Sequence, residues 1–569
     1  MQLRSLLVPS LLVLASGMAS ADVTLPLIFG DHMVLQRDAS VPVWGWADPG
    51  EKVTVAAGSS TASTTAAQDG KWTVKLEKLP VSKTPIEVTV EGKNKIVLKD
   101  VLIGDVWICS GQSNMEFPLS GALKASAEIP KANDPQLRLF RVRHKVALQP
   151  ETNVEGSWEI CTPDTVKSFS AVGYFFGREL RSALNCPMGL IQSAWGGTPA
   201  QAWTSLSGLQ KEPTLNGYVE KQQQNAATYP KLVQDYPALL AAFKEASAKW
   251  EANEGVQYQA SMKEWEAASA KAKAAGQSEP PKPVVPAKPP IPKDPSGGPG
   301  GPSNLFNGMI APLIPYAIKG AIWYQGEANA GNGPEYRTLF GRMITDWREH
   351  WGEGDFPFLF VQLASFDSGS IPWSFLREAQ LKTLALPKTG MASAVDLGDF
   401  HSLKNIHPRD KSDVGLRLAL AAKHVAYGQT LVYSGPLYDS SKVEGGAIRV
   451  HFTQTGGGLQ ISSPPWIDET PAQPWTTDKL IGFEIAGEDG NYVPADAKID
   501  GNSVIVSNPQ VSLPVFVRYA WSNLVWANLY NKEGLPAAPF RTDNQLPVIL
   551  PRPAASTPSP IPSATASPR

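Results

Sequence analysis

Three cysteines in 569 residues are too few for a disulfide framework to hold this chain together. They are Cys109, Cys161 and Cys186, so one pair could join and one thiol would be left over. Histidine is also scarce, with seven residues, and no His, Cys, Asp and Glu cluster has the spacing of a metal site. We therefore expect neither a metal nor another cofactor.

Neither sign of charge is in excess, because 51 Lys and Arg balance 53 Asp and Glu. Without a basic stripe the chain offers little to nucleic-acid phosphates or to an anionic membrane, so we expect neither partner. After the first 21 residues no apolar run is long enough to span a bilayer, and we expect a soluble mature chain. Nothing in the sequence implies an obligate protein partner.

The first 21 residues have the three parts of a secretory signal peptide. Arg4 supplies the positive charge, Leu6 to Leu14 form the apolar run, and Ala19-Ser20-Ala21 is an A-x-A cleavage site. We expect this segment to be removed and the mature protein to be periplasmic or secreted.

Strand and helix patterns divide the mature chain into regions. Residues 22–100 alternate apolar and polar residues between turns, which predicts a small antiparallel β domain. Residues 101–425 alternate apolar strands with helical segments, which predicts an α/β domain with a mainly parallel sheet and helices on both faces. Residues 426–551 return to strands and indicate a β-sandwich-like region, and residues 552–569 have the composition of a disordered tail.

An insertion, residues 206–303, interrupts the α/β domain. Its first part is helical and charged, with aromatic residues at roughly helical spacing that we interpret as the packing face of a helical hairpin. The Pro- and Gly-rich stretch from Ser278 to Pro302 cannot form a core, which indicates an extended linker or exposed loop.

The segment VWICSGQSNMEF ends an apolar strand at a glycine turn and places Ser113 before a helix. A serine there can point its hydroxyl outward beside the backbone N–H groups of the helix start, which is a nucleophile with half an oxyanion hole. Met115 stands where a G-x-S-x-G elbow needs its second glycine, so an α/β-hydrolase elbow is disfavoured. A serine at a strand end is also a common helix cap, so Ser113 alone does not establish catalysis.

Other strands of this domain also end in polar or glycine-rich segments, and the carboxyl ends of parallel strands meet at one edge. Gly196 and Gly197 could bring backbone N–H groups close to a bound anion. Gln325 and Asn329 follow the next strand and offer amide donors for a developing oxyanion.

His407 is the best candidate for a general base among the histidines. Pro408 biases it toward an extended conformation, and an imidazole pKa near neutrality suits proton transfer from a serine. His401 could join His407 as a pair of metal ligands, but no third ligand accompanies them.

Several motifs in order resemble the sialate O-acetylesterase family of SGNH-type carbohydrate esterases. They are GDVWICSGQSNMEFPL, SAWGGTPAQAW, LFNGMIAPL, WYQGEAN, FLREAQ and IHPRDK. The resemblance covers most of the mature chain and leaves out the insertion and the tail. It implies an SGNH-hydrolase-like fold and a secreted serine esterase that removes O-acetyl groups from sugars. Some bacterial relatives in this family act on plant polysaccharides such as xylan or xyloglucan.

The resemblance also implies roles for residues of this chain. Ser113 would be the nucleophile and His407 the base. The oxyanion hole would use the Ser113 N–H, the Gly197 N–H and the Gln325 side chain, with Asn329 as a possible further donor.

The acid that orients His407 stays open. The SGNH pattern has an aspartate three residues before the histidine, where this chain has Lys404. Asp396, at a strand end, is the first choice, and Asp399 and Asp410 are alternatives. A Ser–His dyad oriented by a backbone carbonyl is also possible.

Polar and aromatic side chains near the same strand ends are candidates to contact an O-acetylated carbohydrate substrate. They are Gln112, Asn114, Trp195, Glu327, Trp373 and Arg377. Glu327 could equally be a structural partner of Arg377, and Arg377 could instead face the carboxylate of a sialic acid.

Two other classes of function compete with an esterase. A glycosidase would use a pair of carboxyl groups such as Glu116 and Glu327, and would need neither Ser113 nor His407. A non-catalytic glycan-binding protein would use the β regions and their aromatic residues.

Overall fold

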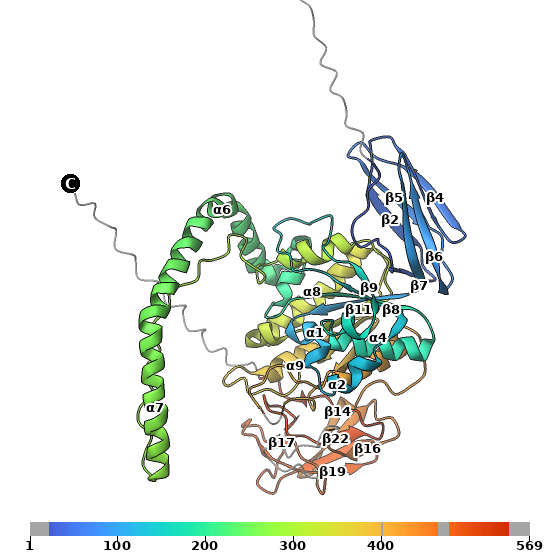
Figure 1. Cartoon of the computed structure of the whole chain (residues 1–569). Coiled ribbons are helices and arrows are strands. Elements are labelled where there is room, and N and C mark those ends of the chain that lie inside the picture. The colour runs from blue at the N-terminus through green and yellow to red at the C-terminus, as the bar shows by residue number, and fades with distance from the viewer. Residues whose placement is uncertain (1–21, 400–401, 465–476, 546–569) are drawn as a thin grey trace, which may run out of the picture.

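A computed structural model of the chain describes residues 22–399, 402–464 and 477–545 (Figure 1). The expected signal peptide, the expected tail and His401 lie outside the described residues.

The centre of the molecule is a sheet with the strand order β13-β12-β11-β7-β10-β8-β9. All neighbours on this path are parallel except β8 and β9. The prediction of an α/β domain with a mainly parallel sheet is confirmed. The strands are β7 (Lys95–Gly111), β8 (Asp134–Arg141), β9 (Trp158–Cys161), β10 (Met188–Ala194), β11 (Gly320–Tyr324), β12 (Phe358–Gln362) and β13 (Thr389–Ser393).

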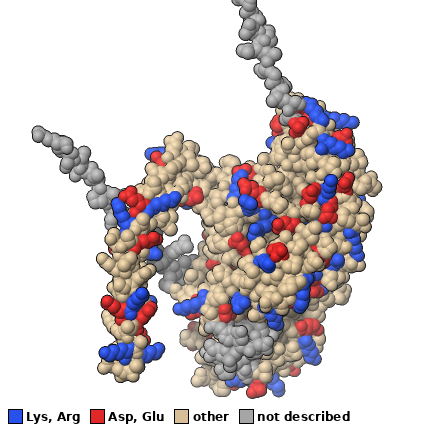
Figure 2. All heavy atoms as spheres, in the orientation of Figure 1, with Lys and Arg blue, Asp and Glu red and all other residues tan. Residues whose placement is uncertain are grey.

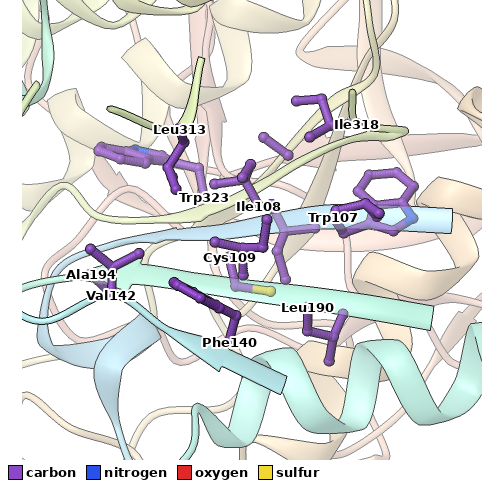
Figure 3. Close-up of a cluster of buried hydrophobic side chains, with 14 of the residues drawn as sticks. Trp107, Ile108, Cys109, Phe140, Val142, Leu190, Ala194, Leu313, Ile318 and Trp323 are labelled. Atoms are coloured by element: carbon purple, nitrogen blue, oxygen red, sulfur yellow. The ribbon is translucent and has the colours of Figure 1, made fainter. Parts of the chain in front are cut away.

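Helices cover both faces of this sheet, as side-chain alternation along the strands requires. Trp107 of β7 packs edge-on against Phe176 of α4, while Trp323 of β11 lies near Phe340 of α8. Trp323 pairs with Ser110, whose side chain points to the opposite face from Trp107. Figure 3 shows Trp323 on one side of the strands and Leu190 on the other, toward a helix.

The helices of this domain include short single turns and longer segments. They are α1 (Ser113–Glu116), α2 (Ala125–Glu128), α3 (Pro163–Val166), α4 (Ala171–Leu184), α5 (Leu206–Gln210), α8 (Gly333–Trp351), α9 (Trp373–Lys382) and α10 (Ser412–Val425), with α6 and α7 described below.

β7 joins the N-terminal β region to the central sheet. β6 pairs antiparallel with its first part, and β10 and β11 pair parallel with its last part. The boundary expected between residues 100 and 101 therefore falls inside one strand, and the two regions share a hydrophobic core. The N-terminal strands are β1 (Val34–Gln36), β2 (Val41–Trp46), β3 (Lys52–Ala57), β4 (Ser60–Thr65), β5 (Lys71–Leu76) and β6 (Ser82–Glu91).

The C-terminal strands build a second core, to which Val395 of the central domain also belongs. Arg541 ties this region to α9 through an ion pair with Glu378 at 2.9 Å. The strands are β14 (Leu437–Glu444), β15 (Ala447–Thr453), β16 (Leu459–Ile461), β17 (Phe483–Ala486), β18 (Val493–Pro494), β19 (Asp496–Asp500), β20 (Ser503–Ser507), β21 (Phe516–Tyr519), β22 (Leu529–Asn531) and β23 (Phe540–Arg541).

The insertion forms an arm that projects from the body (Figure 1). α6 (Asn216–Trp250) passes through a π turn (Glu251–Gly255) directly into α7 (Val256–Ala274), so the prediction of a helical hairpin is wrong. The aromatic residues contact the Pro-rich stretch instead. Trp265 Nε1 donates to the Pro280 carbonyl at 2.8 Å, and Lys288 Nζ lies 5.0 Å from the centre of the Trp250 ring.

All three cysteines are free and buried, so the disulfide that the sequence allowed does not form. Burial raises the pKa of the Cys186 thiol to about 11, which keeps it protonated. Basic and acidic side chains are interspersed over the face shown in Figure 2. No helix in the described ranges has both the length and the apolar character that crossing a bilayer requires.

The end of β7 requires glycine. Gly111 has a φ of 139°, and a Cβ there would lie 2.2 Å from the Tyr324 carbonyl oxygen. The following amide, Gln112 N–H, donates to that same carbonyl at 3.0 Å and fixes the turn before Ser113. The close approach of β7 to β11 therefore sets where α1 begins.

We predict that Gly111→Ala lowers the free energy of unfolding by about 2–4 kcal/mol, because alanine adds both strain and a backbone clash. Chemical denaturation measures this change. Gly30→Ala is the matched control, since its Cβ meets no described atom within 4 Å, and it should change stability by less than about 0.5 kcal/mol. Equal stability of the two variants would contradict this account of the turn.

Candidate active site

The structure brings Ser113 and His407 together at the carboxyl edge of the central sheet. Ser113 Oγ and His407 Nε2 lie 2.8 Å apart, although the residues are separated by 294 positions in sequence. Ser113 is the first residue of α1, directly after β7, and His407 lies on the loop that precedes α10. This distance allows a hydrogen bond through which the imidazole could take the serine proton.

The loop that carries His407 is fixed through its backbone. The His407 N–H donates to Asn405 Oδ1 at 3.1 Å, and Asn405 Nδ2 donates to Asp399 Oδ2 at 2.7 Å. Asp399 therefore acts on the histidine through Asn405 and the main chain.

The electrostatic surroundings favour a neutral imidazole. Burial lowers the pKa of His407 below its ordinary value of 6.5, and the positive charge of Lys411 lowers it further. Around neutral pH the ring can therefore accept a proton.

The prediction that Asp396 orients His407 does not fit its position. Arg417 binds both Asp396 oxygens, at 2.6 and 2.8 Å, and the Tyr530 hydroxyl also donates to this carboxylate. Asp410 Oδ1 accepts from the Asp413 N–H at the start of α10. In the described part of the chain, no carboxylate is hydrogen-bonded to the His407 ring.

Two backbone amides near Ser113 are suited to hold an oxyanion. The Ser113 N–H belongs to the first turn of α1, where amides have no acceptor within the helix. The Gly196-Gly197 turn lies beside the nucleophile, since a Cβ on Gly196 would be 3.2 Å from Ser113 Cβ. Gly197 is exposed and has a φ of 73°, a conformation that glycine adopts without strain.

Gln325 and Asn329 brace this turn, a role that differs from the direct donors we predicted. Gln325 Nε2 donates to the Thr198 carbonyl and to Asn329 Oδ1, and its Oε1 accepts from the Tyr336 hydroxyl. Asn329 Oδ1 also accepts from the Ala200 N–H at 2.9 Å. Both amide side chains are thus occupied by internal bonds.

Glu116 and His144 form a pair at the rim of the site that the sequence analysis missed. Glu116 Oε2 accepts from the Gly196 N–H at 2.7 Å, and its other oxygen lies 2.8 Å from His144 Nε2. The His144 ring stacks on Trp195 with the ring centres 4.0 Å apart. Glu116 stands three residues after the nucleophile, but nothing in the RVRHKV segment indicated His144.

Arg377 does not fit the predicted contact with substrate. It is fully buried, and its guanidinium donates to backbone carbonyls such as those of Leu363 and Ala364. Glu327 accepts a hydrogen bond from Asn114 at 2.6 Å, so it is not the structural partner of Arg377. Trp373 is 4% exposed and packs on Phe366.

The remaining predicted contacts lie closer to the nucleophile. Gln112 and Asn114 flank Ser113 and are almost fully buried, while Trp195 is only half-buried at the rim. Among them, Trp195 has the exposure that a sugar contact needs.

Two further residues near His407 escaped the sequence analysis. Asn405 holds the His407 backbone, and Lys411 is buried behind the site. Both lie within four positions of the histidine, which was the available signal. Among the described residues, no group of three or more His, Cys, Asp and Glu side chains could hold a metal ion.

A parallel α/β sheet with a Ser–His pair at its carboxyl edge has the arrangement of a serine hydrolase. A family model described as "Carbohydrate esterase, sialic acid-specific acetylesterase" matches residues 103–267 and 303–426. The chain belongs to this family of carbohydrate esterases. The match runs through α6 into α7. We expected the whole insertion to lie outside the family, and for its helical part this expectation is wrong.

Individual relatives agree with this family. The chain is 32% identical to mouse sialate O-acetylesterase, with 90% of this chain and 92% of the relative aligned. It is 31% identical to the human enzyme of the same name over 72% of each chain. The solved structure of a carbohydrate acetylesterase from Xanthomonas citri covers 92% of this chain and is itself covered completely, with 36% identity and a TM-score of 0.71.

We predict that kcat/KM falls as the pH drops through the His407 pKa, with the midpoint below 6.5, because only the neutral imidazole accepts the serine proton. A pH–rate profile measures the midpoint. His407→Gln should remove most activity at every pH, whereas His424→Gln, at a histidine stacked on Tyr433, should keep the wild-type profile. A midpoint above 7, or an active His407→Gln enzyme, would contradict the assignment.

Proposed function

We propose that this enzyme removes O-acetyl groups from carbohydrates through an acyl-enzyme formed on Ser113. The observation that carries the proposal is the 2.8 Å contact between Ser113 Oγ and His407 Nε2, next to two backbone amides. The names of the relatives, sialate O-acetylesterase and carbohydrate acetylesterase, support acetylated sugars as the substrate class.

The reaction has two halves. Ser113 Oγ attacks the acetyl carbonyl carbon while His407 Nε2 takes the hydroxyl proton, and the Ser113 and Gly197 N–H groups stabilise the oxyanion. The intermediate collapses, His407 returns the proton to the sugar oxygen, and the sugar alcohol leaves. Water, deprotonated by His407, then attacks the acetyl-serine and releases acetate. One oxyanion donor is worth about 10²–10³ in kcat.

Sialic acid and plant polysaccharides remain the two candidate sources of the acetyl group. A sialic acid carries a carboxylate, and the buried position of Arg377 removes the arginine that could have bound it. Trp195, half-buried at the rim, suits the apolar face of any sugar ring. The signal-like residues 1–21 support action in the periplasm or outside the cell.

We predict that Ser113→Ala lowers acetate release by about 10⁴-fold or more, because the acyl-enzyme can no longer form. The substrates are O-acetylated sialic acid and acetylated xyloglucan and xylan oligosaccharides, tested side by side. Ser110→Ala is the matched control, since Ser110 Oγ is buried with no hydrogen-bond partner among the described residues, and it should retain activity.

The pattern of acetate release distinguishes the candidate functions. The preferred substrate identifies the sugar class. Equal release by wild type and Ser113→Ala would move the nucleophile elsewhere. Cleavage of glycosidic bonds would favour a glycosidase, and binding of these sugars without any release would favour a glycan-binding protein.

A further inference from the structure

Lys411 is a buried cation behind the catalytic pair. Its side chain has no exposed surface, and its Nζ lies 4.9 Å from the centre of the Phe117 ring and 5.4 Å from that of Tyr324. Lysine is almost never fully buried without a partner. In the described part of the chain its hydrogen-bond acceptor is Asn114 Oδ1, at 2.6 Å, and not a carboxylate.

Asn114 connects this cation to the buried carboxyl group of Glu327, whose pKa burial raises above its ordinary value. Its Nδ2 donates to Glu327 Oε1 at 2.6 Å and to the Ile406 carbonyl at 3.0 Å. The neighbours of the Asn114 side-chain amide fix its orientation, because the Lys411 ammonium needs the amide oxygen and the Glu327 carboxylate needs the NH₂ group. Glu327 Oε2 is buried without another hydrogen-bond partner among the described residues.

The bridge touches both halves of the catalytic pair through the chain. Asn114 directly follows Ser113, and Ile406 directly precedes His407. A bond from Asn114 Nδ2 to the Ile406 carbonyl therefore holds the nucleophile turn against the base loop. No carboxylate of the described residues is hydrogen-bonded to the His407 ring.

We propose that Lys411, Asn114 and Glu327 form a hydrogen-bonded bridge that positions His407 in place of an orienting acid, with Lys411 as its positive charge. Lys411 is a positioning residue here, since it acts through Asn114 and through its charge. The inference rests on the proposed esterase function for its role in turnover, but its electrostatic part concerns the free protein.

The charge of Lys411 is present in the pH range that matters. Burial lowers the pKa of Lys411 to about 7, so the ammonium is populated where His407 titrates, below 6.5. A positive charge disfavours a second one nearby, so removing Lys411 raises the pKa of His407. The carboxylate of Glu327 favours the charged form of Lys411.

Other titratable groups face Lys411 and stay unchanged in the test. They are Tyr324, whose ring lies beneath its Nζ, and Asp410, whose charge favours its ammonium.

The test follows the His407 imidazole by NMR in substrate-free protein with labelled histidine, with His407→Gln to assign the signal. We expect Lys411→Met to raise the His407 pKa by about half a unit to one unit. The double variant Lys411→Met/Glu327→Gln should keep the His407 pKa raised as in Lys411→Met, because Lys411 is the charge that acts on His407. The acid limb of kcat/KM should move in the same way.

Lys423→Met is the matched control. Lys423 lies on the same helix and pairs with Glu179 at 2.7 Å, about 18 Å along the helix from Lys411. It should leave the His407 titration unchanged. A purely structural role for Lys411 predicts losses of activity with no shift of the His407 titration in either variant.

An unmoved His407 titration in folded Lys411→Met protein would overturn the bridge. If this variant does not fold, a folded double variant decides instead. A raised His407 pKa supports the bridge, and a wild-type titration, or a double variant that also fails to fold, overturns it. A wild-type chain that releases no acetate overturns the proposed function, whereas the titration on free protein still decides the bridge.

Discussion

The hydrogen bond between Ser113 Oγ and His407 Nε2 depends on the parallel central sheet. Parallel strands end at one edge, so segments 294 positions apart meet there. β7 supplies the serine because Gly111 lets it pass close to β11 and turn at once into α1. The loop before α10 supplies the histidine.

A second layer of side chains holds these segments in place. Gln325 and Asn329 brace the Gly196-Gly197 turn, and Asn405 fixes the backbone of His407. These side chains form their hydrogen bonds within the protein. The backbone amides near Ser113 are therefore the donors that can contact the substrate. Rigid positioning of such donors is a large part of oxyanion stabilisation.

The sequence allowed the prediction of the α/β fold, and it singled out Ser113 and His407, because each follows a local rule about strand ends or proline. The sequence did not allow us to predict which side chains far apart in the chain bind one another. Asp396 stands at a strand end as expected, but Arg417 and Tyr530 bind its carboxylate. The sequence suggested that Arg377 contacts the substrate, but its guanidinium donates to backbone carbonyls inside the protein.

In the insertion too, contacts between distant residues could not be predicted from the sequence. Helical spacing of its aromatic residues was visible, but the spacing does not say what covers them. The prediction of a helical hairpin was wrong because α6 continues into α7 and the Pro-rich stretch returns along the arm to meet Trp250 and Trp265. Lys411 also could not be recognised, since Asn114, which it binds, and Glu327, which binds Asn114, come from other strand ends.

The most direct test of the central claim is to label the enzyme with a fluorophosphonate, which reacts with an activated serine, and to map the adduct by mass spectrometry. We expect one adduct on Ser113, with labelling slowed strongly in His407→Gln because the base is gone. An adduct on another serine, or equal labelling rates with and without His407, would contradict it.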